Sequence, residues 1–251
     1  VVVTGLTTLA AGAANNITLG TATNNFSTVA VTSGNNVVLR DANALELGAS
    51  TISGTLGVTT AGAITQSGAL TVAGTTAVTA GAANNVTLDN AGNDFTGAVS
   101  VVSGRNVAIT DTNALSLGAI TTTGAGNADG GNLTVVAGGA VTLGGAITAN
   151  GGTVVATNPG RTGGAVSITG AGIVMGANTI TASGSAGVGA SQAGGNGGSI
   201  TLVSSNGISG TGALTSSGGT GSATNGSGGN AGSISITNNT AGNLSVGGLL
   251  A

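Results

Sequence analysis

The chain of 251 residues has no cysteine, histidine, lysine, tryptophan or tyrosine, and it has one proline and two phenylalanines. The absence of cysteine excludes disulfide bonds and thiolate metal sites. Only 4% of the residues are charged, and Arg40, Arg105 and Arg161 have no stacking aromatics, so nucleic acid is not an expected partner. No run of 18 apolar residues occurs, and the chain is therefore not expected to span a membrane.

Glycine and small aliphatic residues make up much of what is present. The chain has 51 glycines without a Gly-X-Y period, which argues against a collagen helix, and its 40% hydrophobic content is above that of disordered chains. The chain should therefore fold. Its core has to be built from Val, Ile, Leu and Ala, whose size suits the narrow interior of a stack of coils.

A short phrase recurs along the chain: an asparagine, an aliphatic residue, one further residue and a second aliphatic residue. It begins at Asn16, Asn36, Asn85, Asn106, Asn132 and Asn243. Alternation with period 2, bounded by turn formers, predicts a short strand. Because asparagine tolerates positive φ in turns and stacked amides align, we expect these six residues to form a structural turn ladder rather than a ligand site.

The first half repeats at two scales. Residues 11–19 recur as residues 80–88, and the match continues from Phe26 to Phe95 and, with one inserted residue, from Asp41 to Asp111. Inside this long repeat the phrase that begins at Asn16 begins again at Asn36. Residues 1–125 are therefore expected to form compact coils of about 20 residues, each adding one strand spacing to a stack.

The second half has a longer period. Similar strands begin at residues 132, 165, 199 and 233, each after a pair of small residues such as Gly197-Gly198. We interpret residues 126–251 as coils of about 34 residues that carry Gly/Ser-rich lateral loops. Residues 1–251 are thus predicted to form one all-β domain, a β-solenoid of about ten coils with essentially no helix. The domain is expected to be a segment of a longer protein or a filament subunit.

The six carboxylates offer little for catalysis. They are Asp41, Glu46, Asp89, Asp94, Asp111 and Asp129. Glycoside hydrolysis needs two carboxylates across a groove and usually aromatic platforms, and the sequence offers no such pattern, so no catalytic residue and no cofactor are expected. Asp41 and Asp111 occupy equivalent places beside turns, where solvated turn capping is the expected role.

One polar cluster resembles a set of ligands for a hard cation. Asp89, Asn90, Asn93 and Asp94 surround Gly92 with oxygen-bearing side chains. The equivalent residues 20–25 contain no carboxylate, and the spacing differs from that of the calcium-binding nonapeptide repeat. Because a polar turn explains the same residues, no metal is predicted, and Ca²⁺ at these four residues is the weaker alternative.

The segments NDFTGAVSV (93–101) and DTNALSLG (111–118), together with rungs of the form Gly-Gly-x-(Val/Ile)-x-(Ile/Leu), resemble the repeat region of filamentous haemagglutinin-like adhesins. This similarity to the large exoproteins of two-partner secretion is one of repeat style and covers essentially the whole chain. It implies a single-stranded, right-handed parallel β-helix. It also implies export through a partner pore and display on the surface of a Gram-negative cell.

Sequence and resemblance together predict a non-enzymatic shaft of a bacterial extracellular fibre or surface adhesin. The expected partners are further copies stacked head to tail, flanking coils of the same chain, and glycans or proteins on host or neighbouring cells. The alternative is a carbohydrate-binding or carbohydrate-degrading β-helix. Clustered carboxylates along one groove would favour that alternative.

Overall fold

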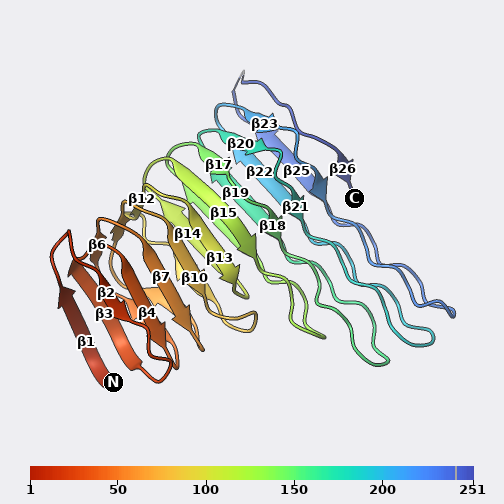
Figure 1. Ribbon diagram of the computed structural model, residues 1–251. Helices are drawn as coiled ribbons and strands as arrows, with labels where there is room; N and C mark the ends of the chain where they lie inside the picture. The colour runs from red at the N-terminus through yellow and green to blue at the C-terminus, as the bar shows by residue number, and fades with distance from the viewer. Residues whose placement is uncertain (241) are drawn as a thin grey trace.

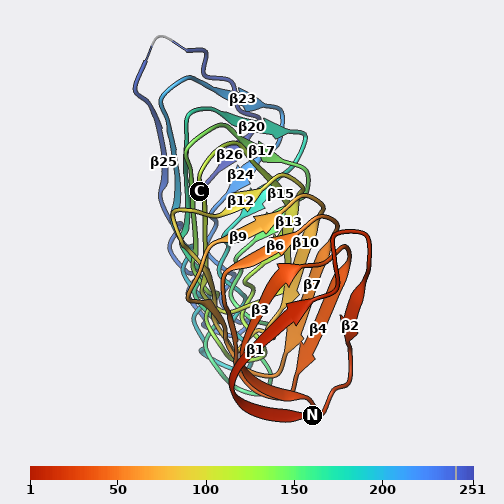
Figure 2. The same ribbon diagram turned by 90° about the vertical axis from the view of Figure 1, so that its left-hand side faces the viewer.

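A computed structural model describes residues 1–240 and 242–251, and in them every regular element is a β-strand. All strand ladders are parallel, and the chain winds as successive turns of a β-helix (Figures 1 and 2). The all-β solenoid prediction is confirmed. None of the described residues belongs to a helix long and apolar enough to cross a membrane.

The strands form three sheets, named A, B and C here. Sheet A contains β1 (Val2–Ala10), β3 (Asn25–Ser33), β5 (Leu45–Leu47), β8 (Ile64–Gln66), β11 (Val86–Leu88), β14 (Val107–Asp111), β16 (Leu133–Ala137), β19 (Val166–Gly170), β22 (Ile200–Ser204) and β25 (Ile234–Asn238). Sheet C contains β6 (Ser50–Ile52), β9 (Leu70–Val72) and β12 (Asp94–Phe95).

Sheet B follows one main path with a side branch. The main path contains β2 (Ile17–Leu19), β4 (Val37–Asp41), β7 (Leu56–Thr60), β10 (Thr76–Thr79), β13 (Val99–Ser103), β15 (Leu115–Thr121), β18 (Ile147–Thr148), β21 (Ile180–Thr181), β24 (Leu214–Thr215) and β26 (Leu249–Leu250). The branch contains β17 (Val141–Leu143), β20 (Ile173–Gly176) and β23 (Ile208–Gly210), and it joins the main path through β15.

Each strand of sheet A opens one coil, and its ten strands number the coils 1 to 10, in agreement with the predicted count. In the first coils, successive partners in sheet B follow at short, nearly even intervals and begin at Ile17, Val37, Leu56 and Thr76. In the last coils, successive partners in sheet A follow at much longer intervals and begin at Leu133, Val166, Ile200 and Ile234. The two halves therefore share sheets but differ in coil length.

The long repeat, which relates residues 11–19 to residues 80–88, does not span a whole number of coils. Strand β2 lies in sheet B, whereas its sequence equivalent β11 lies in sheet A. Likewise, Phe26 lies in β3 of sheet A and its equivalent Phe95 lies in β12 of sheet C. The second copy of the repeat is thus displaced by one face relative to the first.

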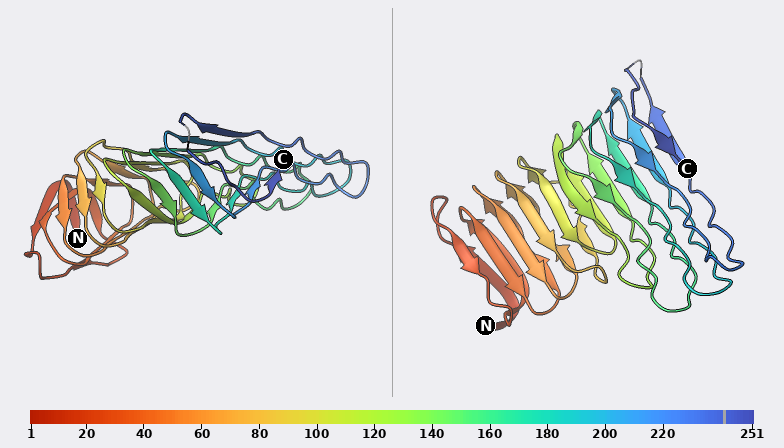
Figure 3. Two further views of the ribbon diagram at one scale, coloured as in Figure 1. Left: turned by 90° about the horizontal axis from the view of Figure 1, so that it is seen from above. Right: turned by 45° about the vertical axis from the view of Figure 1, so that its right-hand side comes forward.

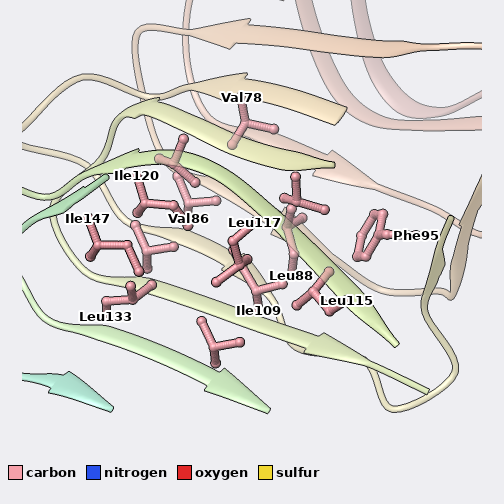
Figure 4. Close-up of a cluster of buried hydrophobic side chains, with 14 of the residues drawn as sticks. Val78, Val86, Leu88, Phe95, Ile109, Leu115, Leu117, Ile120, Leu133 and Ile147 are labelled. Carbon is pink, nitrogen blue, oxygen red and sulfur yellow. The ribbon is translucent and has the colours of Figure 1, made fainter. Parts of the chain in front are cut away.

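The core consists of aliphatic columns that run along the axis, and Figure 4 shows a section of them. In sheet A, Leu88, Ile109 and Val135 stack in register, each less than 2% exposed. The small cross-section is filled without large aromatic side chains other than Phe26 and Phe95, which are 3% and 0% exposed. Each fully buried aliphatic side chain contributes about 1.5 to 3 kcal/mol, so stability is spread along the stack.

From coil 7 onward, long loops leave the stack on one side, and successive loops lie side by side (Figures 1 and 3). These excursions connect sheet B to the next strand of sheet A. Excursion 1 covers residues 149–165, excursion 2 covers 182–199 and excursion 3 covers 216–233. A shorter connection, residues 122–132, precedes them.

Candidate functional site

Five of the six asparagines of the predicted ladder lie in two columns on different faces, and the sixth, Asn243, lies apart from both. Asn16 and Asn36 precede strands of sheet B, whereas Asn85, Asn106 and Asn132 precede strands of sheet A. The separation follows from the displacement of the repeat by one face. Asn243 lies near the sheet B branch, where its carbonyl oxygen accepts a bond of 2.9 Å from the N–H of Ile208.

Within each column, the side-chain oxygen of one asparagine accepts the backbone N–H of the residue above it. The Asn36 N–H donates to Asn16 Oδ1 over 3.1 Å, and Asn36 Oδ1 accepts from the N–H of Thr55 over 3.0 Å. On sheet A, Asn85 Oδ1 accepts from the N–H and from Nδ2 of Asn106, each over 3.2 Å. These amides close backbone ladders at the coil corners.

The sheet A column continues upward into the second half. Asn106 Oδ1 accepts from the N–H of Asn132 over 3.0 Å, and Asn132 Oδ1 accepts from the N–H of Ala165 over 2.9 Å. The expectation of positive φ at these turns is wrong. Among the described non-glycine residues, Ala156, Ser191 and Asn225 have positive φ. The asparagines are needed for their side-chain acceptors, not for a left-handed backbone.

Asp41 and Asp111 cap turns as predicted, but they are buried rather than solvated, with 3% and 2% of their surface exposed. Asp41 accepts the N–H of Phe26 over 2.6 Å and that of Asn43 over 2.8 Å. Asp111 accepts the N–H of Phe95 over 2.7 Å and that of Asn113 over 2.9 Å. Each carboxylate therefore joins two successive coils.

Burial raises the pKa of Asp111 above its ordinary value. The two backbone N–H groups oppose that change because they stabilise the charged carboxylate, and nearby Asp94 adds to it by charge repulsion. A carboxylate so enclosed serves structure, since both of its oxygens are occupied by backbone donors.

The four calcium candidates do not present their oxygens to a common point. Asn93 is 0% exposed, and its Oδ1 accepts from the N–H of Leu70 over 2.9 Å and from Gln66 Nε2 over 2.8 Å. Asn90 Oδ1 accepts from the N–H of Gly92 over 2.9 Å. Asp94 accepts from Asn113 Nδ2, while Asp89 is exposed. No group of three or more acidic or metal-ligating side chains gathers within the described residues.

The Asn93 network was not foreseen from the sequence. Its Nδ2 donates to the carbonyls of Leu88 and Thr110 over 3.1 and 3.2 Å and to Gln66 Oε1 over 3.0 Å. This one amide connects three successive coils inside the stack. The signal available beforehand was its equivalence to Asn24, which is 3% exposed and donates to the carbonyl of Leu19.

The excursions form an ordered layer, which we name the glycine slab. Five backbone N–H groups of excursion 2 donate to carbonyls at the matching places of excursion 3, over 2.7 to 3.0 Å; the donors are Gly184, Gly187, Ser191, Gly194 and Gly197. On each arm the donors are three residues apart. Three residues per turn is the period of the polyproline II helix, which has no internal hydrogen bonds and relies on neighbouring chains.

The two arms of each excursion also bond to each other. The N–H groups of Gly195 and Gly198 donate to the carbonyls of Ser185 and Ala182 over 2.9 and 2.6 Å. A side chain at Gly198 would be only 2.7 Å from the carbonyl carbon of Gly164 in the coil below. Glycine is needed here for close packing of backbones, as in collagen. The Gly/Ser-rich lateral loops are therefore a hydrogen-bonded surface of the solenoid.

Open parallel stacks held together by backbone ladders and turn caps define the class of solenoid repeat proteins. The chain belongs to the family described as repeats of unknown function (DUF5649), whose model matches residues 1–33, 34–102 and 104–162. The second of these matches is as long as the shift that relates residues 11–19 to residues 80–88. No curated protein and no solved structure matches the chain.

Proposed function

We propose that the chain is a non-enzymatic shaft of a bacterial extracellular fibre or surface adhesin of the filamentous haemagglutinin type. The observation that supports this most is the continuous parallel ladder of ten strands in sheet A, which runs the whole length of the molecule. At a strand spacing of about 4.8 Å, ten coils give a rod roughly 50 Å long. A stack with distributed stability suits a load-bearing spacer.

The use of the acidic side chains supports a structural role. Asp41 and Asp111 bind backbone N–H groups, Asp94 accepts from Asn113, and Glu46 accepts from the hydroxyl of Thr28 over 3.2 Å. A glycosidase would instead hold two carboxylates free on either side of its substrate. The slab adds a broad lateral surface of Gly, Ser, Thr and Asn on which a fibre could contact its surroundings.

Electron microscopy and fibre diffraction of the purified chain test the proposal. Rods or filaments with a meridional repeat of about 4.8 Å are expected. Labelling of intact source cells with an antibody against the slab should give surface staining that mild protease removes. Staining confined to permeabilised cells would contradict the extracellular assignment, and compact particles without the repeat would contradict the shaft.

Glycan binding is the second candidate, and one groove favours it. A shallow groove of about 510 Å³ crosses coils 1 to 4; Leu6, Ala30, Gly48 and Ala49 line it together with the polar residues Thr8, Thr28, Thr32, Glu46 and Ser67. Hydroxyls and one carboxylate can bond sugar hydroxyls. A glycan array should then give binding that Glu46→Gln weakens, with no release of reducing ends. Equal binding by the variant would remove this groove from consideration.

A further inference from the structure

The glycine pairs at the end of each excursion have two distinct tasks. The second glycine of each pair is oriented toward the coil below it: a side chain at Gly164, Gly198 or Gly232 would lie 2.6 to 2.7 Å from the carbonyl carbon of the equivalent glycine one coil earlier. Its N–H bonds across the excursion, as Gly232 does to the carbonyl of Ser216 over 2.7 Å. This requirement applies to each of these three glycines, which lie above another glycine of the column.

The first glycine of each pair is oriented toward the coil above it. A side chain at Gly130, Gly163 or Gly197 would lie 2.6, 2.9 or 2.6 Å from the backbone nitrogen of Gly164, Gly198 or Gly232 in the next coil. The N–H of Gly197 donates to the carbonyl of Asn230 in that coil over 2.8 Å. Glycine is required at this position only where another excursion lies above.

The fourth residue of this column is Ala231. It is the equivalent in excursion 3 of Gly163 in excursion 1 and Gly197 in excursion 2, and it is exposed. At the equivalent glycines of the lower coils, a β-carbon would meet the first residues of the next excursion, which are Ala149, Ala182 and Ser216. The neighbouring Gly232, which faces the coil below, is still glycine. The pair Ala231-Gly232 therefore keeps glycine where the coil below would be contacted and replaces it with alanine where a coil above would be contacted.

We infer that Ala231 ends the glycine slab, so that the upper face of excursion 3 rejects a fourth excursion and fits a short turn from sheet B to sheet A, of the kind seen in coils 1 to 4. The inference rests on the proposed function, because it specifies which coil continues the shaft. In the compact coils the chain passes from sheet B to sheet A through short turns, such as residues 42–44 between β4 and β5. Such a turn leaves the space above Ala231 open.

The test inserts a second copy of residues 199–232 after Gly232, which places the first Ala231 beneath a new excursion. The matched control carries Ala231→Gly at that internal position only. Hydrogen exchange of the slab amides, read by mass spectrometry, is expected to be about 10- to 100-fold faster with internal alanine than with glycine, because overpacking of backbones opens the slab locally. Equal protection in the two proteins would overturn the inference.

If both insertion variants fail to fold, a second pair of variants, made in the natural chain, tests the inference. Gly197→Ala should increase slab exchange by a similar factor, whereas Ala231→Gly should leave it unchanged. Loss of protection in Ala231→Gly, or none in Gly197→Ala, would contradict the inference. These readouts concern packing alone, so they are independent of whether the chain forms fibres or binds cells.

Discussion

Coils 1 to 6 and coils 7 to 10 share sheets A and B but satisfy their backbones in different ways. In the compact coils almost every residue is in a strand or a short turn, and side-chain oxygens of Asn24, Asn93, Asp41 and Asp111 complete the corners. In the later coils the excursions bond backbone to backbone with a three-residue period. Side-chain acceptors hold the corners of the first region, whereas the excursions of the second depend mainly on close contact between glycine backbones.

The largest expected effect tests the dependence of the slab on glycine. Gly198→Ala should lower the free energy of unfolding by about 3 kcal/mol, because the new methyl group meets backbone that cannot move aside. Gly57→Ala is the matched control in the compact region, since its nearest neighbour would be the Val37 carbonyl at 3.9 Å. Denaturant unfolding should separate the two variants; equal stability would remove the distinction between the regions.

The next effect concerns the buried carboxylates of the compact region. Asp111→Asn should cost about 2 kcal/mol, because one of the two backbone donors would then face an amide NH₂ group. Asp41→Asn, its counterpart one repeat earlier, should behave alike, and exposed Asp89→Asn should stay within about 0.5 kcal/mol of the wild type. Thermal unfolding of the three variants checks this. An Asp111→Asn variant as stable as the wild type would argue that the hydrogen bonds of Asp111 are not important for stability.

A smaller gain in stability is expected at Thr76, which replaces an aliphatic residue in the sheet B column between Leu56 and Val99. Its hydroxyl is buried and has no hydrogen-bond partner among the described residues. Thr76→Val should stabilise the fold by about 1 kcal/mol. Thr60→Val should do the reverse, because the Thr60 hydroxyl donates to the carbonyl of Gly62 over 2.6 Å. Denaturant unfolding of both variants checks the two signs.

At the tips of the excursions, Ala156, Ser191 and Asn225 have φ of 57°, 58° and 57°. Because a β-carbon is unfavourable in this region, Ala156→Gly should stabilise the protein by about 0.5 to 1 kcal/mol. Ala149→Gly, at a buried position without positive φ, should destabilise it by a similar amount. Chemical denaturation measures whether each variant gains or loses stability. Destabilisation by Ala156→Gly would contradict the inference that the backbone at Ala156 is strained.

The smallest effect is on pH dependence. Because burial raises the pKa of Asp111, the folded state binds this proton more tightly than the unfolded state does. The contribution of Asp111 to stability is therefore complete below the ordinary carboxyl pKa and is lost as pH rises through the raised pKa. Relative to Asp111→Asn, the wild type should gain stability as the pH falls through that window. A constant difference would argue against a raised pKa.

Much of the stack was predictable from the sequence because strands with period 2 and an internal repeat of fixed length leave few alternatives. The prediction of a single Asn ladder was wrong, because nothing in the sequence shows that the second copy of the long repeat begins on a different face of the solenoid from the first. Asp41 and Asp111 gave no sign of burial, because the donors that cover them lie 15 and 16 residues away in the chain. The slab was hidden because Ser, Ala and Asn interrupt its glycine period.

The displacement of the repeat by one face turns duplication into a screw operation. If further copies were added with the same displacement, each would carry the outward side chains one face further round the axis, and a three-faced coil would bring the pattern back to its starting direction after three steps. A long rod grown in this way would present one set of contacts in every direction around its circumference. Such a shaft would not need to be rotated into a particular orientation to meet a neighbour.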